Sequence, residues 1–368
     1  MRYKSIYFVT TESIKNLGNF RNYLIENTQY LVTFHFPHGY LQKSSYVEIF
    51  IGGKLAYRAN FYRYHGKNSI LKLLLYYLYF NYVLFRFVKR GSFIIVENPI
   101  FCILNSIVAF IKRVKFIFWV GDYFPQHAGF MWFYNKIADF YIKRLRYVIY
   151  ISPPIDRIYS IMFGKKSFKN KFRKQISLGI VKKFTKVNKI INDNKSITIG
   201  FIGVIREQQG LDLIFKFLSS NSINCRLEIV GDGYKANHYK ELAKKLGILG
   251  KVKFYGFVEN AEPILKKCDI GLALYENTSD NVSKYCEPVK IKDYLEYGLP
   301  VITTKTTYMH KEIEKFHAGE VIDENVGSLK KAIDKIAKNY SLYEDGINQI
   351  LNKYEYKKWY TKSFSFLE

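Results

Sequence analysis

The chain has 368 residues, 48% of them hydrophobic, and a formal net charge of +26 at pH 7. This length exceeds what one hydrophobic core supports, and this hydrophobic content excludes a disordered chain, so we expect two folded domains. The four cysteines have no CxxC spacing, which argues against a zinc site or a disulfide framework and favours a reducing compartment. The charge favours polyanionic partners. An anionic membrane surface ranks above nucleic acid, because no nucleic-acid-binding motif accompanies the charge.

The first half alternates predicted strands with predicted helices, which is the pattern of a largely parallel sheet. Apolar runs predict strands at Ser5–Thr10, Leu31–Phe36, Tyr46–Ile51, Phe93–Val96, Phe116–Val120 and Tyr147–Ile151. Helices are expected at Ile100–Ile111 and Phe133–Arg146. The loop that follows Val120 carries two polar candidates, Asp122 and His127, at a strand exit where ligands commonly bind.

The span Ile70–Val88 has nearly the length of a bilayer crossing, but Lys72, Asn81 and Arg86 interrupt it. Its tyrosines and the bases that follow it suit a core helix or a helix lying in a membrane interface. We therefore expect that it does not span. Together with the basic charge, it predicts a cytoplasmic protein attached peripherally to the inner face of the cell membrane.

A lysine- and asparagine-rich stretch within residues 175–195 breaks the alternation and predicts a domain boundary. The second half then restarts, with strands expected at Ile197–Ile202, Arg226–Val230, Val252–Tyr255, Ile270–Leu274 and Val301–Thr304. Repeated strand–helix units with glycines in the loops are typical of a Rossmann-like domain. We expect an N-terminal domain at 1–178, a C-terminal domain at 179–342, and a helical segment at 343–368 that packs back toward the N-terminal domain.

The stretch Cys286–Thr304 predicts a helix followed at once by a buried strand. Pro288 suits the first turn of the helix, and Gly298 can end it in a left-handed conformation. Lys290 and Asp293 lie one turn apart near the helix start, where free N–H groups and the macrodipole favour an anion. The alternative for this stretch alone is an ordinary amphipathic helix.

Four segments of the second half, in order, resemble the group 1 family of retaining glycosyltransferases: Ile197–Asp212, Leu227–Gly233, Lys251–Gly256 and Pro288–Ile302. The resemblance implies an α/β protein with the GT-B fold, in which two Rossmann-like domains with parallel sheets face each other across a cleft. It implies a hexosyltransferase that moves a sugar from a nucleotide-diphosphate sugar to a glycan or lipid-linked acceptor. The expected process is synthesis of a cell-envelope polysaccharide, such as lipopolysaccharide or capsule, with retention and without a metal or other cofactor.

The resemblance also implies a donor site. Asp293 stands where the family places its second glutamate, and its carboxylate is expected to bind ribose hydroxyls. Arg206 would meet the diphosphate with its forked donors. Gln209 occupies the place of the family's usual lysine, so Lys290 is the candidate for the missing charge. The expected donor-binding residues are Gly203, Arg206, Gly231, Asp232, Gly256, Phe257, Lys290 and Asp293.

The family pattern has two glutamates eight positions apart, and Tyr285 stands eight before Asp293. Glu287, two residues further on, is the candidate to replace the first glutamate as the contact to the sugar. The expected catalytic residues are Arg206 and Glu287 and, from the N-terminal domain, Asp122 and His127. Two alternatives stay open: a nucleotide-sugar epimerase on the same fold, and a catalytically decayed binding protein, which the missing first glutamate allows.

Overall fold

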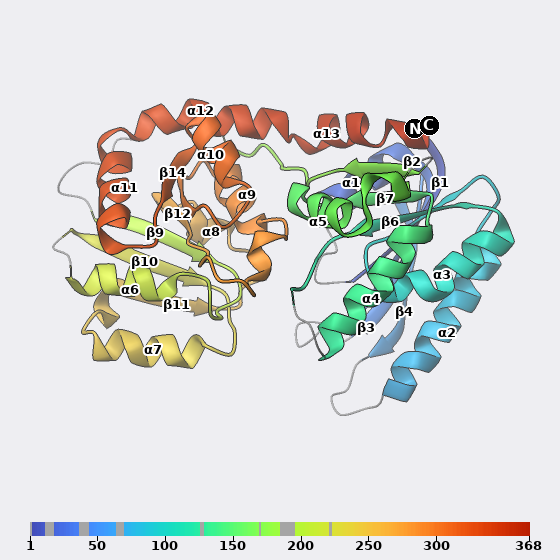
Figure 1. Ribbon diagram of the computed structural model, residues 1–368, viewed down its shortest axis with the longest axis horizontal. Coiled ribbons are helices and arrows are strands. Elements are labelled where there is room, and N and C mark those ends of the chain that lie inside the picture. Colours follow the sequence, from blue (N-terminus) through green and yellow to red (C-terminus); the bar gives the residue numbers. More distant parts are fainter. Residues whose placement is uncertain are drawn as a thin grey trace. The chain divides into compact units, whose positions relative to one another are not determined.

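The protein is described here from a computed structural model, which divides the chain into two compact units (Figure 1). Unit 1 comprises Met1–Gly179 and Tyr356–Glu368, and unit 2 comprises Ile180–Glu355. The chain therefore returns to unit 1 for its last segment. The structure describes residues 2–11, 18–36, 44–63, 70–125, 129–168, 171–184, 196–220 and 223–368.

Unit 1 is built on an eight-stranded sheet with the order β4-β3-β2-β1-β5-β6-β7-β8. Strands β1, β2 and β5 to β8 run parallel, whereas β3 is antiparallel to both of its neighbours. The central parallel strands β5, β6 and β7 are nearly continuous apolar runs, as is typical of strands covered on both faces. The strands are β1 (Tyr3–Thr11), β2 (Thr28–Phe36), β3 (Ser44–Ile51), β4 (Lys54–Arg63), β5 (Phe93–Val96), β6 (Lys115–Val120), β7 (Tyr147–Tyr150) and β8 (Phe172–Gln175).

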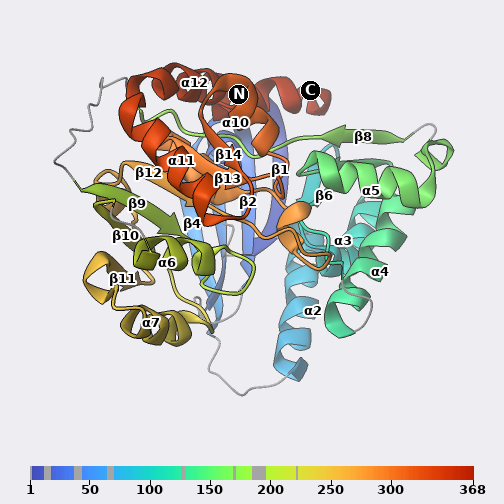
Figure 2. The same ribbon diagram turned by 60° about the vertical axis from the view of Figure 1, so that its left-hand side comes forward.

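The helices of unit 1 pack on this sheet in two groups. Helices α2, α3 and α4 lie side by side (Figure 2), whereas α1 packs separately against α13 (Figure 1). The helices are α1 (Phe20–Asn27), α2 (Ile70–Phe87), α3 (Pro99–Lys112), α4 (Gly129–Arg144), α5 (Pro153–Phe163) and α13 (Tyr356–Ser363). Among the described residues, no helix combines the length and hydropathy needed to cross a bilayer.

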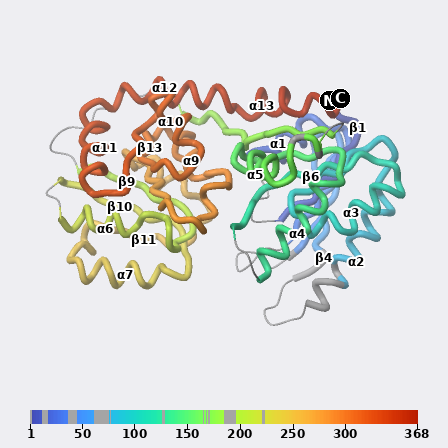
Figure 3. Tube along the Cα trace, viewed as in Figure 1, coloured from blue at the N-terminus to red at the C-terminus, as the bar shows by residue number. Residues whose placement is uncertain are grey.

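The C-terminal segment is tied to unit 1 by an aromatic cluster. Phe364 stacks on Phe20 with ring centroids 4.6 Å apart, and the Tyr360 hydroxyl donates to the Gly18 carbonyl at 2.8 Å. The N- and C-termini consequently lie next to each other in this unit (Figure 3), where Arg2 pairs with Glu368. The segment expected at 343–368 is divided, because α12 (Tyr340–Lys353) packs in unit 2 and only α13 and the residues after it lie in unit 1.

Unit 2 is a Rossmann-like unit with a six-stranded, fully parallel sheet in the order β11-β10-β9-β12-β13-β14. Its strands are β9 (Ile197–Ile202), β10 (Cys225–Val230), β11 (Val252–Gly256), β12 (Ile270–Ala273), β13 (Val301–Thr304) and β14 (Gly319–Ile322). Its other helices are α6 (Leu211–Ser220), α7 (Ala236–Lys245), α8 (Glu262–Leu265), α9 (Val289–Glu296), α10 (His310–Phe316) and α11 (Val326–Lys338). The order reverses between β9 and β12, which is the switch point where such sheets bind ligands.

Candidate active site

The loops that leave β9 and β10 pack against each other through glycines. Gly231 has φ 130°, and a Cβ there would lie 2.0 Å from the Gly203 carbonyl oxygen. A side chain at Gly231 would therefore push the two loops apart. At Gly203, which has φ 135°, a Cβ would lie 3.5 Å from the Lys290 ammonium, so this lysine lies in contact distance of the loop that leaves β9.

The Lys290 ammonium lies under this edge. It donates to Gln209 Oε1 at 2.6 Å and lies 4.2 Å from the centroid of the Phe201 ring. Burial, together with the nearby charge of Arg206, lowers the pKa of Lys290 to about 7. Gln209, which stands in for a lysine, thus receives a lysine from α9 as its hydrogen-bond partner.

Arg206 adds a second positive charge beside the first. It is a half-buried loop residue whose Nη1 lies 3.5 Å from the Glu207 carbonyl oxygen. Within the described ranges, no carboxylate forms an ion pair with Arg206 or Lys290. Two like charges that repel each other and lack a counter-ion favour an anionic ligand at this edge.

Asp293 lies one turn after Lys290 on α9. Burial, with the charge of Glu296, raises the pKa of Asp293 to about 7. Its neighbour Glu296 has partners, since it accepts from the Val181 N–H at 2.9 Å and lies 3.4 Å from the Lys183 ammonium. In the part of the chain that the structure describes, no donor hydrogen-bonds the Asp293 carboxylate. A ligand with hydroxyl groups would supply the missing donors.

The Glu287 carboxylate is buried inside unit 2. One oxygen pairs with the Lys292 ammonium, and the other accepts from the Tyr308 hydroxyl at 2.6 Å. The side chains of Glu287 and Lys292 are only 2% and 4% exposed. Contact with a sugar would require Glu287 to leave these partners.

The remaining residues expected at the donor site lie at the same edge of the sheet and are accessible. Asp232 is exposed, and its Oδ1 accepts from the Gly233 N–H at 2.7 Å. Gly256 ends β11 with φ 68° in open space, and the side chain of Phe257 after it is 57% exposed. Contacts in the structure join Gly203 with Gly231 and Lys290, and Gly231 with Gly256, whereas the grouping of all eight residues in one donor site stays a prediction.

In unit 1, Asp122 follows β6 and is half-buried, whereas His127 lies outside the described residues. Sequence reasoning missed Glu97, which follows β5 and is buried. Its Oε1 accepts from the Thr11 N–H at 2.7 Å and the Thr10 hydroxyl at 3.3 Å, and burial raises its pKa to about 7. The available signal was an acidic residue directly after a buried strand.

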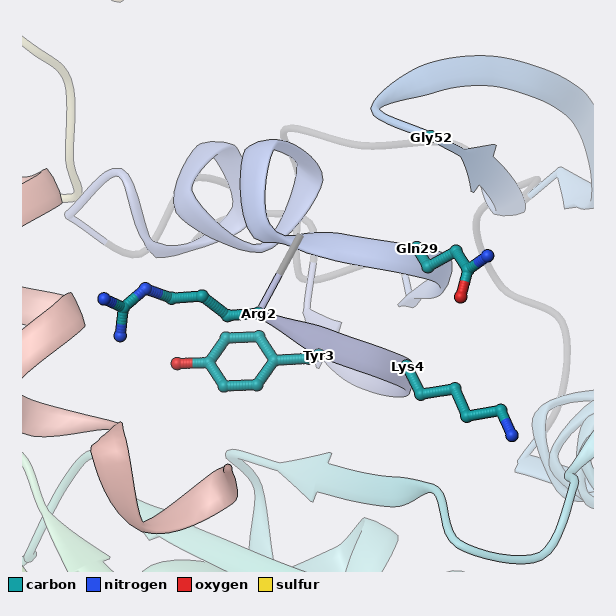
Figure 4. A pocket seen from close by; sticks show the side chains of 5 residues that line it. All are labelled: Arg2, Tyr3, Lys4, Gln29 and Gly52. Atoms are coloured by element: carbon teal, nitrogen blue, oxygen red, sulfur yellow. The ribbon is translucent and has the colours of Figure 1, made fainter.

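A surface pocket lies at the opposite edge of the unit 1 sheet (Figure 4). It is lined by Arg2, Tyr3, Lys4, Gln29 and Gly52, at the starts of β1 and β2 and the turn after β3. Ligands of such sheets bind at the carboxyl ends of the strands, so this pocket is not the candidate site. Across the described residues, no group of three or more His, Cys, Asp or Glu side chains is placed to hold a metal ion.

Two α/β units with parallel sheets, and an anion-favouring site at the carboxyl edge of the second, define the glycosyltransferases with the GT-B fold. Residues 182–353 match the family model described as glycosyl transferases group 1. This match identifies the protein as a glycosyltransferase, and unit 2 carries the sequence pattern of the group 1 family. No curated protein matches the chain in sequence.

Solved structures match the chain along nearly its whole length. HepE of Anabaena, in complex with UDP and glucose, superposes with a TM-score of 0.68 at 14% identity, covering 99% of each chain. The lipopolysaccharide outer core galactosyltransferase WaaB matches with a TM-score of 0.63 at 17% identity, covering 99% of this chain and 98% of that one. A TarM variant of S. aureus, in complex with UDP, α-GlcNAc-glycerol and fondaparinux, matches with a TM-score of 0.59 at 12% identity, covering 89% and 75%. These likenesses establish the fold.

Proposed function

We propose that the protein transfers a sugar from a nucleotide-diphosphate sugar to a glycan or lipid-linked acceptor during synthesis of a cell-envelope polysaccharide. The observation that carries the proposal is a group of charged side chains at the carboxyl edge of the unit 2 sheet that one ligand could complement. Among the residues that the structure describes, Arg206 and Lys290 have no counter-ion, and Asp293 has no hydrogen-bond donor. A nucleoside diphosphate supplies both kinds of partner, because its phosphates are counter-ions for the cations and its ribose hydroxyls are hydrogen-bond donors for the carboxylate. The UDP held by HepE and the lipopolysaccharide substrate class of WaaB support this choice.

The proposed reaction retains the anomeric configuration and uses no metal ion. The bond between the anomeric carbon and the β-phosphate oxygen breaks, and the acceptor hydroxyl attacks the same face of the sugar. The hydroxyl proton passes to the leaving phosphate oxygen, so the products are the glycoside and the nucleoside diphosphate. Arg206 and Lys290 stabilise the negative charge that develops on the leaving group. Asp122 and His127 are the proposed groups that orient the acceptor.

For Glu287, the partners seen in the structure favour a positioning role. Its ion pair with Lys292 fixes the segment before α9 to the helix itself. Lys290 lies two residues before Lys292 and Asp293 one residue after it, so this ion pair holds both donor-site residues in place. A direct contact between Glu287 and the donor sugar remains the competing role.

The proposed place of action is the inner face of the cell membrane, where lipid-linked acceptors are found. An anionic membrane surface is the partner proposed for the net charge of +26.

The test is a thermal-shift panel of nucleoside diphosphates and nucleotide sugars, beginning with uridine compounds. A ligand that binds only the native state raises its melting temperature. We expect one nucleotide to stabilise the wild type and the Glu241→Ala control, whose substituted acid is exposed on α7, but not Asp293→Ala. No stabilisation by any nucleotide would overturn the proposal.

A turnover assay separates transfer from its two competitors. Release of nucleoside diphosphate that depends on an added acceptor supports transfer. Isomerisation of the donor without an acceptor would identify an epimerase, and binding without any turnover would identify a binding protein.

A further inference from the structure

The outward side of α3 is apolar where a helix covering a sheet is normally polar. Ile103, Ile107, Phe110 and Ile111 recur at helical spacing along this side and are exposed, with Phe110 85% exposed. The inward side holds the amide of Asn105, which is fully buried. The other buried residues of this helix are apolar, so α3 is largely apolar on both sides and lacks the polar outward face expected beside water.

The neighbouring helix α4 interleaves aromatic and basic side chains on its outward side. Trp132, Phe133 and Phe140 are between 42% and 54% exposed. The Lys136 ammonium lies 5.5 Å from the centroid of the Trp132 ring, and the Arg144 guanidinium lies 3.7 Å from that of Phe140. Aromatic rings beside cations are typical of the headgroup region of a membrane, where the ring faces the lipid and the cation faces the phosphates.

Helix α2 continues the pattern. Leu75, Leu78, Tyr79 and Tyr82 lie on one side of it and are each about half exposed or more, while Asn81 faces inward and is buried. The three helices form one surface, because the Tyr77 hydroxyl of α2 donates to the Ile100 carbonyl of α3 at 3.0 Å and α3 also contacts α4 (Figures 1 and 2).

This surface has many more basic than acidic residues. Asp139 is the single acidic residue in the sequences of α2, α3 and α4. Their basic residues are Lys72, Arg86, Lys112, Lys136, Lys143 and Arg144. More than half of the strongly exposed large hydrophobic residues in the described part of the chain also lie on these helices. An exposed apolar patch of this extent marks an interaction surface.

We propose that the outward face of α2, α3 and α4 inserts shallowly into an anionic lipid leaflet. Its aliphatic and aromatic side chains enter the acyl boundary, and its lysines and arginines bind the headgroup phosphates. Positive charge without matching acids complements anionic lipid, whereas a second copy of the chain would bring the same charge and repel it. The inference rests on the proposed function in one respect, since a transferase using lipid-linked acceptors needs a membrane-facing surface.

The test compares vesicle binding by two matched double variants of the full chain. Phe110→Ser/Ile111→Ser removes apolar groups from α3, and Leu249→Ser/Leu342→Ser removes exposed apolar groups from unit 2. In sedimentation with phosphatidylcholine vesicles containing phosphatidylglycerol, the α3 variant should lose affinity by about tenfold or more. The unit 2 variant should bind as the wild type does. Binding of the wild type should weaken as salt rises, because exposed charges are screened over about 10 Å at 0.1 M.

A fluorescence readout reports insertion directly. The emission of Trp132 should shift to shorter wavelength when anionic vesicles are added, and the shift should be absent in Trp132→Phe. Three results would overturn the proposal: no pelleting of the wild type at low salt, equal binding by the α3 variant, or self-association that the α3 substitutions abolish without any vesicle binding.

Nucleotide binding distinguishes failure of this inference from failure of the proposed function. The nucleotide-induced thermal shift is measured without vesicles, and the α3 variant should keep it, which also shows that the variant is folded. A nucleotide shift without vesicle binding would overturn the membrane surface alone. Vesicle binding without any nucleotide shift would overturn the donor site alone.

Discussion

Asp293→Asn is expected to stabilise the ligand-free protein while removing nucleotide binding. The pKa of Asp293 is raised from 3.8 to about 7, first by burial and then by the charge of Glu296. Near neutral pH the Asp293 carboxyl of the folded protein therefore either stays protonated or carries a charge that burial destabilises. In the unfolded chain the same carboxyl ionises in water without this penalty. Asparagine has nearly the same shape and no charge, so it removes the cost and keeps the packing.

The gain from this substitution depends on pH in a defined direction. Below about pH 4 the carboxyl is protonated in both states, and it contributes no penalty. Between pH 4 and 7 the unfolded chain loses the proton first, so the free energy of unfolding of the wild type falls as pH rises, and above pH 7 the penalty is constant. The rise from 3.8 to about 7 corresponds to at most roughly 4 kcal/mol. With relaxation of the site we expect about 2 kcal/mol at pH 8, or about 4–8 °C in melting temperature.

The assay is thermal unfolding of wild type and Asp293→Asn from pH 5 to pH 8, with Asp232→Asn as the control. Asp232 is an exposed acid at the same sheet edge, so its replacement should leave the melting temperature within a degree or two. The melting temperature of Asp293→Asn minus that of the wild type should increase with pH. The nucleotide-induced increase in melting temperature should be lost in Asp293→Asn. A difference that is zero or negative at pH 8, or constant from pH 5 to 8, would refute the reasoning.

Two further predictions concern the other charges of α9. Because the pKa of Lys290 is lowered to about 7 and an anion would raise it, affinity for a nucleoside diphosphate should fall as pH rises above 7, by up to about tenfold per pH unit. Calorimetric titrations at pH 6 to 9 check this, and a flat profile in the wild type would contradict it. Lys292→Met should cost about 3–5 kcal/mol, because it leaves the buried Glu287 carboxylate unpaired, and Glu287→Leu/Lys292→Met should recover most of that loss. Urea unfolding of the three proteins measures both values, and equal destabilisation by the single and double substitutions would contradict the ion pair.

The central strands of both sheets could be predicted from the sequence almost residue by residue. Ile197–Ile202 and Val301–Thr304 are apolar or β-branched runs buried on both faces, and the structure has them with the predicted bounds. The left-handed glycine predicted at the end of the helix before Val301–Thr304 is also confirmed, since Gly298 has φ 75°. In these segments burial, propensity and turn chemistry all favour the same structure.

The strands that were missed lie at the edges of the sheets. β4 contains three basic residues and an asparagine, β8 reads Phe-Arg-Lys-Gln, and β14 has only four residues, so none of them shows the continuous apolar run of a buried strand. An edge strand is held by one neighbour, and its sequence has to suit water on its open side. β8 and β14 moreover pair with strands that lie before an intervening helix, and a local pattern does not contain those contacts.

Some residues of the candidate site could likewise be selected from a local pattern, whereas others depend on partners that are distant in sequence. Lys290 and Asp293 could be selected because helical spacing near one helix start places them together. Glu97 was missed because its hydrogen-bond donors come from Thr10 and Thr11, which lie far away in sequence at the end of a neighbouring strand. The partners of Glu287 were not predictable either, since Tyr308 joins the site only through folding of the loop after β13.

Helix α9 shows how a buried structural charge differs from a buried charge that awaits a ligand. Glu287 and Lys292 satisfy each other, with Tyr308 completing the carboxylate, so this pair needs nothing from outside the protein. On α9 itself, Lys290 and Asp293 are half-buried, and burial, reinforced by the like charges of Arg206 and Glu296, moves their pKa values toward neutrality. Leaving both residues desolvated makes the free protein less stable and the liganded protein more stable. That asymmetry is expected of a binding site and serves no purpose in a core.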